Sequence, residues 1–328
     1  MKKSLFTSIE TPEVNLNTLV DSYGRKIRKL RISLTDKCNL RCHYCMPLDA
    51  TFMDEQRYLS VDEYAQVVED LCKFGLEEVR ITGGEPLLRK SFKSLVEKIG
   101  SLPLKKIGLT TNAVLLHKYI EDLCEYRVHH INISLDSLNE DRFNKITRSK
   151  NFKKVLENIS LAKSAGLNIK INTVLMKGVN DDEIFDFIEF SRELEIPIRF
   201  LEFMRIGHGR QEQEDQFISA PEIIKNIKKK YEMNLISSEI DSTSVNYRLC
   251  NGAEIGFIAS ESMPFCGHCS RWRLSCDGII KACLLKSEGL SIKGLESKER
   301  EEVYYELLGM KPFLRPKEVS HQMNSIGG

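Results

Sequence analysis

Three cysteines stand close together near the start of the chain. Cys38, Cys42 and Cys45 have the spacing C-x3-C-x2-C, and we call them the first triplet. Three thiolates this close can wrap one iron–sulfur cluster, but they leave its fourth iron without a protein ligand, so that iron can bind a substrate or cofactor. Zinc is the alternative. It normally takes four ligands, and His43 lies between Cys42 and Cys45, where it is poorly placed to be the fourth.

A second group of three cysteines lies near the other end of the chain. Cys266, Cys269 and Cys283 have the spacing C-x2-C-x13-C, and we call them the second triplet. A zinc ribbon would need a fourth ligand, which Cys276 or His268 could supply. The residues alone therefore leave zinc and an iron–sulfur cluster open at this place.

The overall composition is that of a folded protein without a strong charge bias. The chain has 328 residues, is 41% hydrophobic, and carries 48 Lys and Arg against 47 Asp and Glu. This balance gives no reason to expect nucleic acid or a membrane surface as a partner, so an anionic ligand needs a local site. No apolar run is long enough for a signal peptide or a membrane span, so we expect a cytoplasmic protein. In that reducing compartment the ten cysteines are better explained as metal ligands and buried thiols than as disulfides.

Short β-branched runs alternate with segments of helical period between residues 27 and 205. Six strands are predicted, at residues 27–35, 78–82, 106–111, 129–135, 168–175 and 197–203. Two of the helices between them are predicted over 61–71 and 152–162, with Gly75 and Gly166 ending them. This order predicts an α/β fold, an incomplete (βα)6 TIM-type barrel. Functional groups in such a fold follow the carboxyl ends of the strands, where the first triplet lies.

The alternation of strands and helices ends after about residue 215. A basic helix is predicted over 220–231, followed by antiparallel strands over 245–250 and 254–259 and by the loop of the second triplet. We interpret residues 216–328 as a C-terminal α+β extension that closes the open side of a barrel formed by residues 1–215. The basic run 225–230 is interpreted as the solvated face of its helix.

The first triplet and a glycine-rich turn resemble the radical S-adenosylmethionine (SAM) superfamily. The turn consists of Gly83, Gly84, Glu85 and Pro86 at the end of the second predicted strand, and it looks like the GGEP motif of that superfamily. Two adjacent glycines let a backbone approach a ligand closely. The resemblance implies that the open iron of a [4Fe–4S] cluster binds the amino and carboxylate groups of SAM and delivers the electron that cleaves it to a 5'-deoxyadenosyl radical.

The second triplet and the segment between its last two cysteines resemble the GTP 3',8-cyclase family. Arg271, Trp272 and Arg273 follow closely after Cys269 and place two cationic side chains beside the triplet, and the chain ends in Gly327 and Gly328. The resemblance covers nearly the whole chain. It implies a second [4Fe–4S] cluster facing the purine of GTP, and the radical cyclisation of GTP that is the first step of molybdenum cofactor biosynthesis.

The resemblance also assigns roles to single residues. Its GTP-binding positions fall on Arg31, Arg80, Thr110, Lys170, Arg271, Trp272 and Arg273. Its SAM-binding positions fall on Tyr44, Gly84, Ser134 and Met204. The residues implied in catalysis are Arg271, Arg273, Gly327 and Gly328. Arg31, Arg80 and Lys170 lie on predicted strands, where a charge is costly unless it is paired or faces a ligand-filled interior.

Partners follow from the same resemblance. It implies a flavodoxin-type electron donor, a homodimer, and a downstream synthase that forms cyclic pyranopterin monophosphate. Two alternatives remain open. Another radical SAM enzyme with an auxiliary cluster, such as a peptide maturase, would share the first triplet but lack nucleotide-binding arginines. A non-catalytic module that binds zinc or nucleic acid would contain zinc and no iron.

Overall fold

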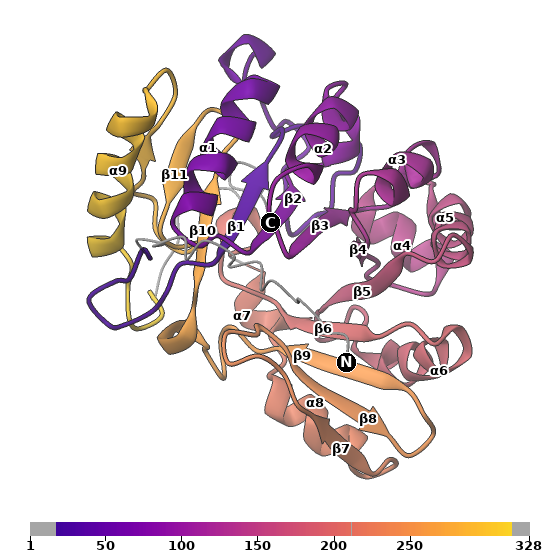
Figure 1. Ribbon diagram of the computed structural model, residues 1–328. Helices are drawn as coiled ribbons and strands as arrows, with labels where there is room; N and C mark the ends of the chain where they lie inside the picture. Colours follow the sequence, from indigo (N-terminus) through magenta and orange to yellow (C-terminus); the bar gives the residue numbers. More distant parts are fainter. Residues whose placement is uncertain (1–17, 211, 317–328) are drawn as a thin grey trace, which may run out of the picture.

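Residues 18–210 and 212–316, which this computed structural model describes, form one curved sheet of twelve strands with helices on its outer side (Figure 1). The strands follow the order β12-β11-β10-β1-β2-β3-β4-β5-β6-β9-β8-β7 across the sheet. Its middle is therefore built from the first six strands in chain order, and strands from the C-terminal region lie on both sides of them.

The six strands expected from the sequence are all present and parallel. They are β1 (Lys29–Ser33), β2 (Glu78–Thr82), β3 (Lys106–Thr111), β4 (His130–Ser134), β5 (Asn168–Leu175) and β6 (Ile198–Glu202). Each pairs with the next one along the chain. Parallel neighbours need long crossover connections, and the helices between them supply these. The predicted α/β class, with a large parallel sheet, is confirmed.

Strands of the C-terminal region lengthen the sheet at both edges, which the sequence pattern did not predict. β9 (Glu254–Ile258) pairs in parallel with β6, and β10 (Arg271–Leu274) pairs in parallel with β1. Antiparallel strands follow outward, namely β8 (Val245–Leu249) and β7 (Met233–Ile236) beyond β9, and β11 (Ile279–Lys281) and β12 (Leu290–Ser291) beyond β10. This pairing satisfies backbone groups that the edges of β1 and β6 would otherwise leave open.

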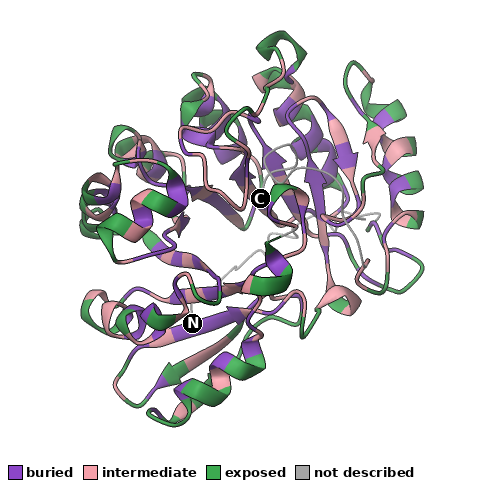
Figure 2. Ribbon diagram, turned by 180° about the vertical axis from the view of Figure 1, so that it is seen from behind, coloured by how far each residue is buried: buried purple, intermediate pink, exposed green. Residues whose placement is uncertain are grey.

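Helices separate the sheet from solvent. Six of them lie in the connections between the parallel strands, with α4 and α5 sharing one connection, namely α1 (Val61–Lys73), α2 (Phe92–Gly100), α3 (Ile120–Glu125), α4 (Glu140–Thr147), α5 (Phe152–Ser164) and α6 (Ile184–Leu194). The C-terminal region adds α7 (Gln213–Gln216), α8 (Ala220–Ile227) and α9 (Ser297–Gly309). Figure 2 shows buried strands and helices whose outward sides are exposed. The core between them includes Ile81, Leu109 and Ile133, which are fully buried.

Local sequence signals explain the ends of α1 and α5. The Ser60 hydroxyl accepts from the Glu63 N–H, and the Glu63 carboxylate accepts from the Ser60 N–H, which is a capping box. Gly75 follows α1 with φ +89°, and Gly166 follows α5 with φ +78°. This left-handed conformation is common after a helix end and suits glycine. Both predicted helix ends are confirmed.

The basic helix is shorter than predicted. α8 ends at Ile227, and residues 228–230 follow it outside the helix with their lysine side chains exposed. Exposure agrees with the interpretation of this run as a solvated surface. No helix in the described part of the chain combines the length and the apolar character needed to cross a bilayer.

Candidate active site

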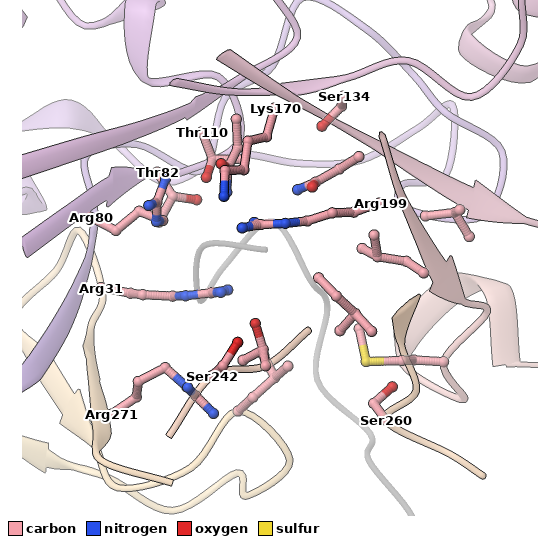
Figure 3. Close-up of a pocket in the computed structure, with 18 of the residues that line it drawn as sticks. Arg31, Arg80, Thr82, Thr110, Ser134, Lys170, Arg199, Ser242, Ser260 and Arg271 are labelled. Carbon is pink, nitrogen blue, oxygen red and sulfur yellow. The ribbon is translucent and has the colours of Figure 1, made fainter. Parts of the chain in front are cut away.

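A cavity of about 730 Å³ lies on the inner side of the curved sheet. All six cysteines of the two triplets line it. Side chains from the parallel strands line it as well, among them Arg80, Thr110 and Lys170 (Figure 3). The first triplet follows β1, and two cysteines of the second triplet precede β10. Because β10 pairs with β1, two groups of cysteines that are far apart in sequence reach the same cavity.

The loop that carries the first triplet is held against the end of α4. The backbone N–H groups of Arg41 and His43 donate to the carbonyl oxygens of Thr147 and Ile146, each at 3.0 Å. Within the triplet, the Cys45 N–H donates to the Cys42 carbonyl at 3.0 Å. These bonds define the path of the loop backbone.

The surroundings of the first triplet disfavour thiolates in the metal-free chain. Burial, followed by the nearby Glu85 carboxylate, raises the pKa of Cys38 to about 11. Burial, with Cys38 and Asp136, raises the pKa of Cys45 to about 12. Burial and Asp136 raise the pKa of Cys42 as well. A bound metal would reverse this preference, because it stabilises the deprotonated ligand.

Gly83 and Gly84 press against the loop of the first triplet. A Cβ atom at Gly84 would lie 2.3 Å from the Lys37 carbonyl oxygen, and one at Gly83 would lie 2.7 Å from the Thr35 carbonyl oxygen. The Gly84 N–H donates to that same Thr35 oxygen at 2.7 Å. The sequence analysis interpreted these two glycines as residues that let the backbone come close to a ligand. Gly84 does line the cavity, but the close contact that excludes a side chain is with the protein's own backbone.

The second triplet spans the start of β10 and the loop after β11. A short 3-10 helix (Cys266–His268) brings Cys266 and Cys269 together, and the Cys269 N–H donates to the Cys266 carbonyl at 3.1 Å. The Cys283 Sγ atom accepts from the Leu285 N–H at 3.4 Å. Ala282 is buried just before Cys283 and anchors that arm of the triplet.

Cys269 is set apart from the other cysteines by its charged neighbours. Burial alone would raise the pKa of its thiol, but the positive charges of Arg271 and Lys311 outweigh burial and lower the pKa to about 6. The Lys311 ammonium also donates directly to the Cys269 Sγ atom, at 3.4 Å. The second triplet therefore contains one thiol that ionises readily even without metal.

Arginines from neighbouring strands form a row along the cavity wall. The sheet register places Arg31 of β1 directly beside Arg273 of β10 and Arg80 of β2. The next strand carries Gly108 beside Arg80, and a Cβ atom there would lie 2.8 Å from the Arg80 guanidinium. The missing side chain thus leaves the space that Arg80 occupies. Figure 3 shows Arg31, Arg80 and Arg271 extending into the pocket.

These cations repel one another in the ligand-free chain. Burial lowers the pKa of Arg31, and the three arginines around it lower it further. Burial and Arg271 lower the pKa of Arg273 to about 10. On β5, burial and Arg199 lower the pKa of Lys170 to about 8. Gathering several cations in a partly buried wall is costly, and a bound anion would reduce that cost.

The predicted positions Tyr44, Thr110, Lys170, Ser134 and Met204 also line the cavity. Tyr44 is fixed in orientation, because its hydroxyl donates to the Asp136 carboxylate at 2.7 Å. Asp136 in turn accepts from the Val174 N–H at 2.9 Å. The structure therefore brings together the residues expected for SAM and for GTP in one cavity.

Among the predicted site residues that the structure describes, Trp272 is the one that does not line the cavity. It lies between Arg271 and Arg273 on β10, and successive side chains of a strand point to opposite faces. Its indole is fully buried and packs against Tyr304, with 6.1 Å between ring centroids. A contact between this indole and GTP is not supported. The other two predicted positions, Gly327 and Gly328, lie outside the described residues.

Three further residues of the cavity wall were not predicted. Among the described residues, Arg199 Nε, Asn172 Oδ1 and Ser260 Oγ are buried atoms without a hydrogen-bond partner. Arg199 lies within β6, so a charge inside a strand, the feature that supported the assignment of Arg31, could have drawn attention to it. Asn172 lies two residues after Lys170 on the same face of β5. Nothing in the sequence pattern indicates Ser260.

The donor set of the cavity fits iron–sulfur clusters. All the cysteines of both triplets are free thiols. In each triplet, one cysteine sulfur accepts a hydrogen bond from the backbone N–H of the residue two positions after it. The Leu40 N–H donates to the Cys38 Sγ atom and the Leu285 N–H donates to the Cys283 Sγ atom, each at 3.4 Å. Such N–H···S bonds are typical of cluster ligands. Among residues 18–210 and 212–316, no three His, Cys, Asp or Glu side chains are arranged to hold a single metal ion.

Comparison with known proteins defines the class. A profile described as the Radical SAM superfamily matches residues 32–191, and one described as Molybdenum Cofactor Synthesis C matches residues 196–319. A crystal structure of Streptococcus suis SuiB bound to precursor peptide SuiA has a TM-score of 0.60 and 14% identity, covering 90% of this chain and 69% of that one. That likeness shows the fold alone. The fold and the first match define a radical SAM protein, a class that implies a [4Fe–4S] cluster and SAM.

Sequence relatives define the particular family. A GTP 3',8-cyclase of Synechocystis is 56% identical over 95% of this chain and 95% of the relative. A GTP 3',8-cyclase of Clostridium botulinum is 41% identical over 87% of this chain and 92% of the relative, and one of Listeria monocytogenes is 43% identical over 85% of each. The chain belongs to the GTP 3',8-cyclase family. It is therefore a radical SAM enzyme of molybdenum cofactor biosynthesis.

Proposed function

We propose that this chain converts GTP to (8S)-3',8-cyclo-7,8-dihydroguanosine 5'-triphosphate in the first step of molybdenum cofactor biosynthesis. In this proposal the first triplet holds the [4Fe–4S] cluster that binds SAM. The second triplet holds a second [4Fe–4S] cluster, and the purine of GTP lies beside it. The parallel strands form an incomplete (βα)6 barrel within residues 1–215, and residues 216–328 are the extension that closes it.

The row of arginines is the observation that carries the GTP assignment. Arg31, Arg80 and Arg273 stand side by side on three strands, and the charges that act most strongly on Arg31 are other cations. Glu78 pairs with Arg80 at 3.4 Å, and a triphosphate would supply further negative charge to this wall. Lys170 lines the same cavity and would complete the set. A peptide substrate would give no comparable reason for so many cations.

The protein residues position and shield, while the cofactors carry the radical chemistry. When bound, the reduced cluster and SAM supply the radical that removes the hydrogen atom from C3' of GTP. Tyr44, Gly84, Ser134 and Met204 line the cavity and would hold SAM. Arg271 and Arg273 would hold GTP so that its C3' and C8 atoms face each other, and the buried walls exclude water from the radical.

The proposal includes partners and a location. A flavodoxin-type protein supplies electrons, a downstream synthase consumes the cyclised nucleotide to form cyclic pyranopterin monophosphate, and the enzyme works as a cytoplasmic homodimer. Gly327 and Gly328 take part in catalysis at the end of the chain. These statements rest on family resemblance.

The test begins with iron and sulfide in anaerobically purified protein. The wild type is compared with two variants in which all three cysteines of the first triplet, or all three of the second, are changed to alanine. We expect about eight irons in the wild type and about four in each variant, because each [4Fe–4S] cluster contributes four. The wild type is then incubated with SAM, GTP and a reductant, and 5'-deoxyadenosine and the cyclised nucleotide are measured by mass spectrometry.

Three results would reject the proposal in part or in whole. A wild type with about four irons, all lost with the first triplet, would remove the second cluster. Formation of 5'-deoxyadenosine that does not depend on GTP, without any cyclised nucleotide, would point to a different radical SAM substrate. A colourless protein that contains zinc and no iron would reject the whole assignment.

A further inference from the structure

A buried lysine contacts the second triplet and has no role in the function proposed above. Lys311 is only 4% exposed. Its Nζ atom lies 3.4 Å from the Cys269 Sγ atom, 2.7 Å from the Arg271 carbonyl oxygen and 2.9 Å from the Ala282 carbonyl oxygen. An ammonium group has three N–H donors and no acceptor, so these three acceptors match it. Since Ala282 directly precedes Cys283, Lys311 reaches both arms of the triplet.

The backbone around Lys311 is itself held in place. The Arg25 guanidinium donates to the carbonyl oxygens of Lys311 at 3.1 Å, Pro312 at 2.9 Å and Cys266 at 2.7 Å. Asp21 pairs with the same guanidinium at 2.6 Å, and both side chains are buried. One arginine thus ties the peptide of Cys266 to the segment that carries Lys311. A donor supported in this way keeps its geometry.

Within residues 18–210 and 212–316, no ammonium or guanidinium group donates a hydrogen bond to a sulfur atom of the first triplet. Cys38 accepts only from neutral groups, the Leu40 N–H at 3.4 Å and the Asn112 amide at 3.7 Å. A hydrogen bond from an ammonium to a thiolate is stronger than one from a neutral N–H. Hydrogen bonds to the sulfurs are one of the factors that set the reduction potential of a cluster.

We propose that Lys311 is a positioning residue for the second [4Fe–4S] cluster, which donates to the Cys269 thiolate and raises the reduction potential of that cluster. The added electron makes the cluster more negative, so a buried cation beside a ligand sulfur stabilises the reduced form more than the oxidised form. This inference rests on the proposed function, because it requires a cluster at the second triplet.

The experiment uses full-length protein in which the cysteines of the first triplet are changed to alanine, so that every iron signal comes from the second cluster. Lys311→Met, Lys311→Gln and Lys311→Arg are introduced into this background. Reduction is followed by electron paramagnetic resonance at controlled potentials. We expect Lys311→Met to lower the ratio of reduced to oxidised cluster about tenfold at a fixed potential, which is a shift of about 59 mV for one electron. We expect a smaller shift for Lys311→Gln and the smallest for Lys311→Arg.

Lys286→Met is the matched control. Lys286 lies three residues after Cys283, but 41% of its side chain is exposed, so solvent screens its charge and the potential should not change. An unchanged potential in Lys311→Met would overturn the inference. If Lys311→Met loses the native circular dichroism spectrum, the test uses Lys311→Gln instead. A wild-type reduction potential in Lys311→Gln would then overturn the inference.

The iron content separates this inference from the function it depends on. About four irons in the background protein establish the second cluster, and the potentials then test Lys311 alone. Background protein that folds but contains no iron would reject the second cluster, and with it the proposed function, whatever Lys311 does.

Discussion

The two triplets have the same ligand type, and a backbone N–H bonds to a sulfur in the same way in each, but their electrostatic surroundings differ. Next to the first triplet lie the carboxylates of Glu85 and Asp136, and with burial they keep the thiol pKa values high, about 11 for Cys38. Next to the second triplet lie Arg271 and Lys311, which bring the pKa of Cys269 down to about 6 despite its burial.

The two triplets therefore differ in the charges that surround their sulfur atoms within one cavity. Under the proposed function, Asp136 would lie near the positive sulfonium group of SAM, and the arginines beside the second triplet would lie near the triphosphate of GTP. We call this arrangement the division of the cavity. The division also gives each triplet a separate task under the proposed function, one in cleaving SAM and the other in binding GTP.

The largest effect expected from this division concerns the triplets themselves. Changing the first triplet to alanine should abolish both 5'-deoxyadenosine and the cyclised nucleotide, because SAM loses the iron that binds it. Changing the second triplet should abolish the cyclised nucleotide but leave some cleavage of SAM. Both products are measured by mass spectrometry under anaerobic conditions with a chemical reductant. Cyclised nucleotide from the variant of the second triplet, at the wild-type rate, would show that the division is wrong.

Single arginines should have the next largest effect. Arg31→Met and Arg273→Met should each weaken GTP binding about ten- to hundredfold, since a hydrogen bond to a charged group contributes about 1.5–3 kcal/mol. SAM affinity should stay within about twofold. Equilibrium dialysis with labelled ligands measures both. Lys225→Met, at an exposed position on α8, is the charge-matched control. Equal losses for SAM and GTP would argue against the division of the cavity.

The pH dependence of GTP binding should be weaker but measurable. The pKa of Lys170 is lowered to about 8, chiefly by burial, so this side chain is charged below pH 8 and neutral above it in the ligand-free chain. Bound triphosphate favours the charged form, and linkage then requires GTP affinity to fall between pH 7.5 and pH 9, by up to about tenfold. Lys170→Arg should flatten this profile because arginine stays charged. An identical slope in that variant would assign the titration to another group.

The smallest effect is expected at Gly108. Gly108→Ala places a methyl group against the Arg80 guanidinium, which is the far end of a flexible side chain and can move. We expect GTP affinity to fall a few-fold, while the free energy of unfolding changes by less than about 1 kcal/mol. Denaturant unfolding and dialysis measure the two quantities. In an Arg80→Met background the same substitution should change GTP affinity no further, because the two effects share one contact.

Much of the site could be predicted from local patterns. The six parallel strands follow from β-branched runs bounded by turns, and the spacing of each triplet is a local property of the chain. Family resemblance marked Arg31, Arg80 and Lys170, and their place inside predicted strands supported it, because a strand interior rarely tolerates a charge without a partner. The same place inside a strand could have drawn attention to Arg199.

Tertiary structure alone decided how these parts meet. The pairing of β10 with β1 places Arg273 beside Arg31 and turns the Trp272 indole into the core, and a pairing between distant strands leaves no trace in local periodicity. The contact of Lys311 with Cys269 joins segments from different elements, so no spacing rule could reveal it. The sequence by itself indicated the two cysteine triplets and the six parallel strands, because ligand spacing and periodicity act over short distances. The folded chain decided which of those residues share one cavity and which charges surround each of them.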